Sequence, residues 1–161
     1  SIYINPDQIA LEKFGDWNSP EAVLNAAKYA TEKRYEYLEQ RQDFVFETVF
    51  SSPEKLEFVR KAKDLGYFVR FFYVCTANPE INVNRIVKRF LNGGHEVPIS
   101  KILSRYYKSL TNAALAIKLV DRAYDNSIDD KLPQLLYRTI DGHLKKQYSS
   151  NLPEWAMNLI E

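Results

Sequence analysis

The chain has 161 residues, of which 45% are hydrophobic and 27% charged, so it is long enough to bury its own core and is neither a disordered tail nor a membrane protein. Its formal net charge of +1 excludes a strong overall attraction to nucleic acid or to an acidic membrane. A single cysteine, Cys75, excludes an internal disulfide and a cysteine zinc cluster, and with no signal-like or long apolar run the expected compartment is the cytoplasm.

Short β-prone runs alternate with segments of helical period along the chain. Such alternation predicts an α/β fold with a mostly parallel sheet that helices cover on both faces. In chain order, we expect a strand at 2–4, a helix at 20–41, a strand at 44–46, a helix at 53–66, a strand at 67–74, helices at 79–91 and from 99 onward, strands at 119–124 and 135–140, and a terminal helix at 152–160.

The helices begin and end at recognisable local signals. Serine or asparagine followed by proline starts a helix, because the first side chain caps it and proline needs no N–H partner there. Gly93 and Gly94 end one helix and separate it from the next, which Pro98 introduces. The apolar spacing predicts buried faces at Val23, Ala27, Ala30, Arg34 and Leu38, at Leu56, Val59 and Ala62, and at Ile81, Ile86, Val87, Phe90 and Leu91.

Polar residues follow directly after the predicted strands. In open parallel sheets, ligands bind beyond the carboxyl ends of the strands, which here are followed by Asp7, Glu47, Thr48 and Thr76. One carboxylate can accept a proton from a substrate hydroxyl while another holds the substrate or a magnesium ion. The structural alternative is that Asp7 caps a helical turn over residues 8–11.

A second candidate is the basic segment at 85–108, which surrounds the two glycines. Arginines on helices that flank a glycine hinge are typical of a mobile lid over phosphate, because guanidinium bonds phosphate oxygens in pairs. The alternative is that they form the solvated faces of two amphipathic helices. A nucleic-acid interface is disfavoured by the near-zero net charge and by the lack of a recognised motif. The basic residues are Arg85, Lys88, Arg89, His95, Lys101, Arg105 and Lys108.

Five strings occur along residues 2–127 in a fixed order. They are Ile4-Asn5-Pro6-Asp7-Gln8-Ile9-Ala10, Phe44-Val45-Phe46-Glu47-Thr48-Val49-Phe50-Ser51, Gly93-Gly94-His95-Glu96-Val97-Pro98, Arg105-Tyr106 and Tyr124-Asp125-Asn126-Ser127. In this order and spacing they resemble the zeta-toxin family of P-loop kinases. The family's characterised toxins phosphorylate a hydroxyl of UDP-N-acetylglucosamine, so the resemblance implies an ATP- and Mg²⁺-dependent phosphotransferase with a helical lid and a small-molecule substrate such as a nucleotide sugar.

The resemblance also implies roles for individual residues. Asp7 matches the acid that activates the acceptor hydroxyl, and Glu47 with Thr48 matches the acceptor-binding strand end. Arg89 occupies the position of a lid arginine that binds phosphate in the family. His95 lies in the region where the family has a second such arginine, and Arg105 is the candidate to replace that arginine here. Asp125 and Asn126 match the loop near the nucleotide base. No metal ligands are assigned.

The phosphate-binding loop of the family has no counterpart in the printed sequence. Its pattern, G-x-x-x-x-G-K-[ST], supplies the N–H groups and the lysine that hold a triphosphate, and none of the five glycines fits it. We therefore expect residues 1–161 to form one kinase domain without its first strand and phosphate loop, which would precede Ser1. Truncation or disorder would explain the missing loop, and truncation or removal of an initiator methionine would explain the start at Ser1. The alternative is a non-catalytic relative that binds an antitoxin-like protein.

Overall fold

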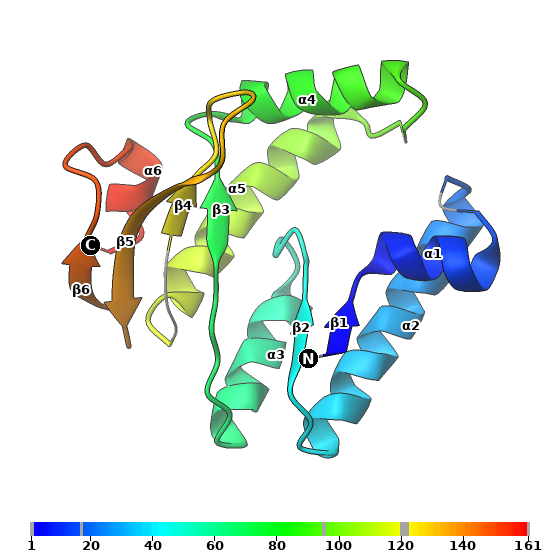
Figure 1. Ribbon diagram of the computed structural model, residues 1–161, viewed down its shortest axis with the longest axis horizontal. Helices are drawn as coiled ribbons and strands as arrows, with labels where there is room; N and C mark the ends of the chain where they lie inside the picture. The colour runs from blue at the N-terminus through cyan, green and yellow to red at the C-terminus, as the bar shows by residue number, and fades with distance from the viewer. Residues whose placement is uncertain (1, 17, 95, 120–122, 161) are drawn as a thin grey trace. The chain divides into compact units, whose positions relative to one another are not determined.

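The computed structural model describes residues 2–16, 18–94, 96–119 and 123–160. The chain forms two compact units, Ser1–Thr48 and Val49–Glu161 (Figure 1). No helix in the described part of the chain is long and apolar enough to cross a membrane. The expectation of one domain over residues 1–161 remains a prediction.

The first unit contains two strands and two helices. They are β1 (Ile2–Ile4), α1 (Pro6–Phe14), α2 (Pro20–Glu39) and β2 (Phe44–Phe46). Strands β1 and β2 pair in parallel, with Ile4 opposite Phe46, and α1 packs on α2. Both helices have proline at their first position after a capping side chain, as the sequence predicts for α2.

The buried face of α2 differs from the prediction in its first two turns. Ala22 and Ala26 are buried, whereas the predicted Val23 and Ala27 are exposed. The buried stripe keeps its four-residue spacing but begins one residue earlier in these two turns. Both strands form where the sequence predicts them, and of their residues Ile4 is buried.

The second unit contains a four-stranded sheet and four helices, in the order α3 (Pro53–Asp64), β3 (Tyr73–Cys75), α4 (Pro79–Leu91), α5 (Ile99–Ala116), β4 (Ala123–Asp125), β5 (Gln134–Ile140), β6 (His143–Gln147) and α6 (Glu154–Met157). The sheet order is β3-β4-β5-β6, with β3 and β4 parallel and the later pairs antiparallel. Helices and parallel pairs agree with the predicted α/β class, but the sheet of this unit is not mostly parallel. Strand β6 was not predicted, and α6 is shorter than expected.

The hydrophobic core of this unit lies where β3 and β5 meet α5 and α6. Leu136, Tyr137 and Ile117 are among its most deeply buried side chains. Tyr137 donates a hydrogen bond to the Ala156 carbonyl at 2.8 Å, which joins β5 to α6. Helix α5 passes behind β3 and β4 in Figure 1 and carries Ala113 into this core.

The strand predicted at 67–74 is only partly formed. Burial alternates along residues 67–75 as in a strand, with Phe71 and Tyr73 turned inward and Phe68 and Phe72 exposed. Among the described residues, only Tyr73–Cys75 have a ladder partner, in β4, and residues 67–72 are not assigned to a strand. The prediction was therefore wrong in length, because β-propensity alone does not determine where ladder pairing begins.

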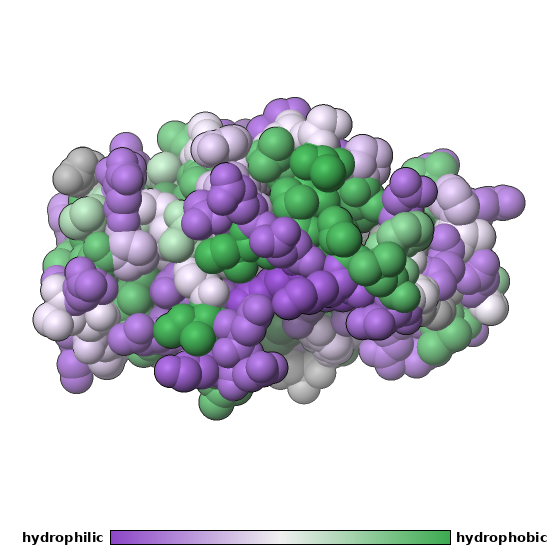
Figure 2. All heavy atoms as spheres, turned by 90° about the horizontal axis from the view of Figure 1, so that it is seen from above, coloured by the Kyte–Doolittle hydropathy of each residue, from purple (hydrophilic) through white to green (hydrophobic). Residues whose placement is uncertain are grey.

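The predicted buried face of α4 is wrong. The helix begins and ends where expected, but none of its residues is buried, and Val87, Phe90 and Leu91 are 42%, 46% and 76% exposed. Figure 2, which views the molecule from the side of α4, shows hydrophobic side chains gathered on this face beside hydrophilic ones.

Two glycines end α4 sharply, as predicted. Gly93 has φ of 90°, which disfavours other residues, and a Cβ added to Gly94 would lie 2.8 Å from the Arg89 carbonyl oxygen.

Candidate functional site

The carboxyl edge of the β1–β2 pair brings predicted site residues together. Because Ile4 lies opposite Phe46, the chain leaves both strands at the same edge, with Glu47 directly after β2 and Asp7 in the first turn of α1. The Asn5 side chain caps α1 by accepting from the N–H of Asp7 at 2.9 Å, so the alternative in which Asp7 is the cap is wrong. Asp7, Glu47 and Thr48 are all exposed.

Tyr3 lies beside Glu47 at this edge, and the sequence pattern did not single it out. The Glu47 carboxylate raises the pKa of Tyr3 above its ordinary value, and the Tyr3 hydroxyl accepts from the Asn5 amide at 3.3 Å. Tyr3 therefore connects to the residue that caps α1 and faces the carboxylate that follows β2. The missed signal was the alternation in β1, which places Tyr3 on the opposite face from the buried Ile4.

The loop after β4 is bound to the end of β3. Asn126 donates its N–H to the Cys75 carbonyl at 2.7 Å. Ser127 donates to Asp125 Oδ1 at 2.7 Å and accepts from the N–H of Ala77 at 2.6 Å. The predicted nucleotide residues Asp125 and Asn126 therefore lie at the carboxyl end of the parallel β3–β4 pair, where ligands bind in open α/β sheets.

Buried hydroxyl groups fasten α5 to the same strand end. Tyr106 donates to the Thr76 carbonyl at 2.8 Å. Ser109 donates to the Tyr106 carbonyl and accepts from the Tyr73 hydroxyl, both at 2.9 Å. Burial raises the pKa of the Cys75 thiol, so this cysteine stays protonated and is a core residue, as predicted. Thr76 bonds Asn82 and the Asn78 carbonyl, so its side chain has a structural role.

These tyrosines predict a loss of stability at alkaline pH. Burial raises the pKa of Tyr73, Tyr106 and Tyr137 above 10.0. In the unfolded chain they ionise near pH 10 while the folded chain keeps their protons, so the stabilising effect is complete below pH 10 and lost above it. We expect the free energy of unfolding to fall above pH 10 by up to about 1.4 kcal/mol per pH unit for each tyrosine.

Urea titrations at several pH values between 8 and 11 measure this effect. Tyr137→Phe should make the decline with pH shallower, whereas Tyr107→Phe, at an exposed position of α5, should leave its slope unchanged. Equal slopes for both variants and the unmodified protein would contradict the assignment.

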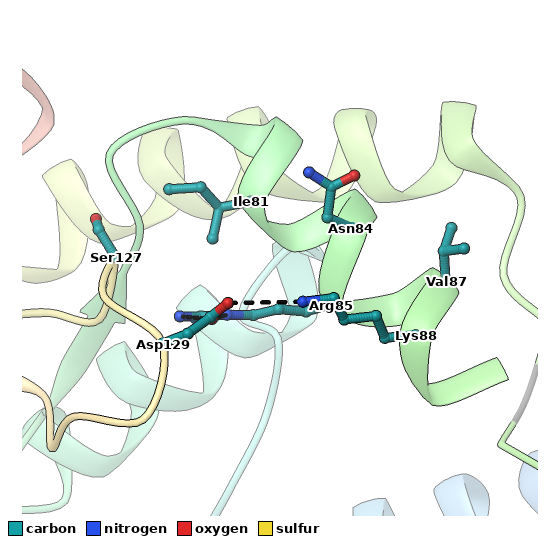
Figure 3. Close-up of a pocket in the computed structure, with 7 residues that line it drawn as sticks. All are labelled: Ile81, Asn84, Arg85, Val87, Lys88, Ser127 and Asp129. Carbon is teal, nitrogen blue, oxygen red and sulfur yellow. Dashed lines mark hydrogen bonds and ion pairs between the residues drawn. The ribbon is translucent and has the colours of Figure 1, made fainter. Parts of the chain in front are cut away.

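An open pocket of about 350 Å³ lies between α4 and the loop after β4 (Figure 3). One side is formed by α4 residues, and the other by loop residues that include the hydroxyl of Ser127. Arg85 crosses the floor of the pocket to Asp129, as the dashed line in Figure 3 shows. The lining residues are Ile81, Asn84, Arg85, Val87, Lys88, Ser127 and Asp129.

The predicted lid residues lie on the two helices that flank the glycines. Arg89 is exposed in the last turn of α4, and Arg105 is half-buried on α5, which packs against α4. His95 lies outside the described residues, so its predicted role is untested. Arg85 of the same basic segment is engaged by the loop after β4, so it does not belong to a solvated helix face. The described residues contain no cluster of three or more side chains suited to holding a metal ion.

The family model for zeta toxin matches residues 14–137, which is more than half of the chain. The chain belongs to the zeta toxin family. An uncharacterized protein of Haemophilus influenzae is 28% identical over 105 residues, covering 65% of this chain and 74% of that protein. No solved structure matches the chain.

Membership in the zeta toxin family gives a coarse functional assignment. The family is kinase-like, generally uses ATP and Mg²⁺, and implies a toxin–antitoxin context with a small-molecule substrate. The acceptor does not follow from membership. The predicted site residues divide between the units, with Asp7, Glu47 and Thr48 in the first and Arg89, Arg105, Asp125 and Asn126 in the second.

Proposed function

We propose that the chain is the larger part of an ATP-dependent phosphotransferase that phosphorylates a hydroxyl of a small, nucleotide-activated sugar. The observation that supports this most is the pair of carboxylates, Asp7 and Glu47, at one edge of a parallel strand pair in a zeta toxin family member. Tyr3 lies beside Glu47 at that edge. An exposed carboxylate pair suits an acceptor with several hydroxyl groups, because each carboxylate accepts hydrogen bonds only.

In this proposal, the first unit binds and activates the acceptor. Glu47 and Thr48 bind hydroxyl groups that do not react, and Asp7 accepts the proton of the reacting hydroxyl. The new bond forms between that hydroxyl oxygen and the γ-phosphorus, the bond from the γ-phosphorus to the bridging oxygen breaks, and ADP leaves with that electron pair. General-base catalysis of this kind needs the carboxylate of Asp7 ionised.

The second unit binds the phosphate donor. Arg89 and Arg105 donate hydrogen bonds to the phosphoryl oxygens, and His95 is proposed to bind substrate beside them. Asp125 and Asn126 lie beside the nucleotide base, and the open pocket bounded by α4 leaves room there. ATP supplies the phosphoryl group, and Mg²⁺ offsets its negative charge.

We also propose a P-loop fold in which a strand that carries the phosphate loop pairs with β3. Strand β3 is the last strand of its sheet, and among the described residues only β4 pairs with it. The alternating burial along residues 67–75 fits a strand of a wider sheet, with Phe68, Phe72 and Val74 on a face that a further helix would cover.

The proposed function is tested with the protein expressed from its natural coding region. We expect ADP release and phosphorylation of UDP-N-acetylglucosamine, measured by mass spectrometry, in the presence of ATP and Mg²⁺. Arg89→Ala should lower kcat about 10²-fold or more, because it removes a cation that stabilises the transferred phosphoryl group. Arg60→Ala, at an exposed position of α3, is the matched control and should leave kcat unchanged.

The outcomes separate the proposed alternatives. If ATP is bound but UDP-N-acetylglucosamine is not phosphorylated, the kinase assignment stands and the acceptor is another hydroxyl compound. If the natural protein neither binds nor hydrolyses ATP, the phosphotransferase proposal fails.

A further inference from the structure

Arg85 uses all parts of its guanidinium group to hold the loop after β4. Its Nε and Nη2 each lie 2.9 Å from Asp129 Oδ1, and its Nη1 donates to the Asn126 carbonyl at 2.7 Å. The Arg85 side chain is 20% exposed and that of Asp129 is 59% exposed, so water screens their ion pair in part, whereas the bond to the Asn126 carbonyl is partly buried. Arg85 lies 41 residues before Asn126 in the chain and connects α4 to a loop distant in sequence.

The same loop is also attached at its other end. Asn126 donates to the Cys75 carbonyl, and Ser127 bonds both Asp125 and the N–H of Ala77. Residues 125–129 are therefore held between the end of β3 and the second turn of α4. In Figure 3 the Arg85 side chain extends from α4 beneath the pocket towards Asp129.

We infer that Arg85 is a positioning residue. It fixes the loop of residues 125–129, which is proposed to contact the nucleotide base, on helix α4, so that binding of the base and the position of α4 are coupled. This inference rests on the proposed function, because it assigns the nucleotide base to the loop at Asp125 and Asn126. Arg85 does not bind phosphate in this role, since its donors are already engaged by Asp129 and Asn126. Arg89, one turn further along α4, remains the lid arginine that binds phosphate.

Arginine is required for this role because of its shape. The planar guanidinium reaches a carboxylate and a carbonyl at the same time, whereas the single ammonium of lysine cannot keep both contacts in this geometry. Lys88 also faces Asp129, but at 3.8 Å and with a side chain that is 71% exposed, so it does not replace Arg85. Without Arg85, the loop keeps its hydrogen bonds to the end of β3, but its one remaining described contact with α4 is the longer ion pair between Lys88 and Asp129.

The first test follows the loop without any ligand. Hydrogen exchange of peptides covering residues 125–129 is measured by mass spectrometry in the natural full-length protein and in Arg85→Ala, Arg85→Lys and Asp129→Asn. We expect exchange about tenfold faster in Arg85→Ala, with a smaller increase in Arg85→Lys and in Asp129→Asn. The matched control is Arg60→Ala, which removes an exposed arginine that pairs with Glu57 on α3 and should not change this peptide.

The second test separates the base from the phosphates. Affinities for ATP and for inorganic tripolyphosphate are measured by calorimetry on the same proteins. We expect Arg85→Ala to weaken ATP binding about tenfold and tripolyphosphate binding hardly at all, because tripolyphosphate has no base. For turnover, KM for ATP should rise more than kcat falls, and Arg85→Lys should restore only part of the loss.

The outcomes test the positioning role of Arg85 separately from the proposed phosphotransferase function. Unchanged exchange of residues 125–129 in Arg85→Ala overturns the positioning role, whether or not ATP binds. Equal weakening of ATP and tripolyphosphate also overturns it, because it would make Arg85 a phosphate ligand. An unmodified protein that binds neither compound contradicts the proposed function instead.

Discussion

Replacing Asp7 by asparagine is expected to lower kcat for phosphotransfer by roughly two to four orders of magnitude, the usual contribution of a general base. Asparagine keeps the size of the side chain but cannot take the hydroxyl proton. The cap of α1 is made by Asn5, so the substitution leaves the capping side chain in place. KM for ATP should stay within about twofold, because in the proposed mechanism Asp7 binds the acceptor and not the nucleotide.

The matched control is Glu12→Gln on the same helix. Glu12 is also an exposed carboxylate and accepts a hydrogen bond from the Gln8 amide at 2.7 Å, so this variant makes the same chemical change away from the strand edge. Initial rates of acceptor phosphorylation over a range of ATP and acceptor concentrations measure both constants. If Asp7→Asn and Glu12→Gln have equal kcat, the assignment of Asp7 as the base is wrong.

Helix starts were predicted well because their signals are local. In α2, α3 and α4 the capping position is a serine or asparagine and the first helical residue is proline, and each helix begins where this pair predicts. The end of α4 at Gly93 is similarly encoded, since φ of 90° favours glycine. Such signals act within one helical turn and need no knowledge of the tertiary structure.

The extent of the strands and the buried face of α4 could not be predicted, because both depend on partners distant in sequence. Residues 67–72 have the composition and the alternating burial of a strand but lack a bonded neighbour in the described structure. Phe90 and Leu91 lie on an apolar stripe that the helical period reveals, yet the fold covers neither. Periodicity predicts which side of a helix is apolar, but it does not show what packs there.

In the candidate site, too, features with local signals were predicted and contacts between residues distant in sequence were not. Strand-end positions were predicted because parallel strands present their carboxyl ends at one edge, and this placed Asp7 and Glu47 among the candidates, whereas Asp125 came from the family resemblance. Arg85 was noted only as part of a basic segment, because its pairing with Asp129 spans 44 residues. A contact of that separation has no signature in a single sequence, whereas the resemblance to a kinase family draws attention to phosphate-binding arginines.

Replacing Leu136 by alanine is expected to lower the free energy of unfolding of the second unit by about 2–5 kcal/mol. Leu136 is 1% exposed in the core that β5 forms with α5 and α6, so its removal loses hydrophobic burial and leaves a cavity. Whole domains are stable by only about 5–15 kcal/mol, so this one substitution removes a large share. The Leu136 carbonyl accepts from the N–H groups of Tyr148 and Ser149, and these contacts remain in alanine.

Guanidinium chloride titration followed by circular dichroism gives the change in midpoint, and hydrogen exchange of residues 134–140 assigns it to this core. The control is Leu132→Ala, which makes the same change four residues earlier, at a side chain that is 93% exposed. It should alter stability by less than about 0.5 kcal/mol, because no buried surface is lost. Equal losses of stability in Leu136→Ala and Leu132→Ala would contradict the burial of Leu136 in the core. A large difference would establish that β5, which was predicted as a strand but runs antiparallel to β4, contributes the central apolar side chains of the second unit.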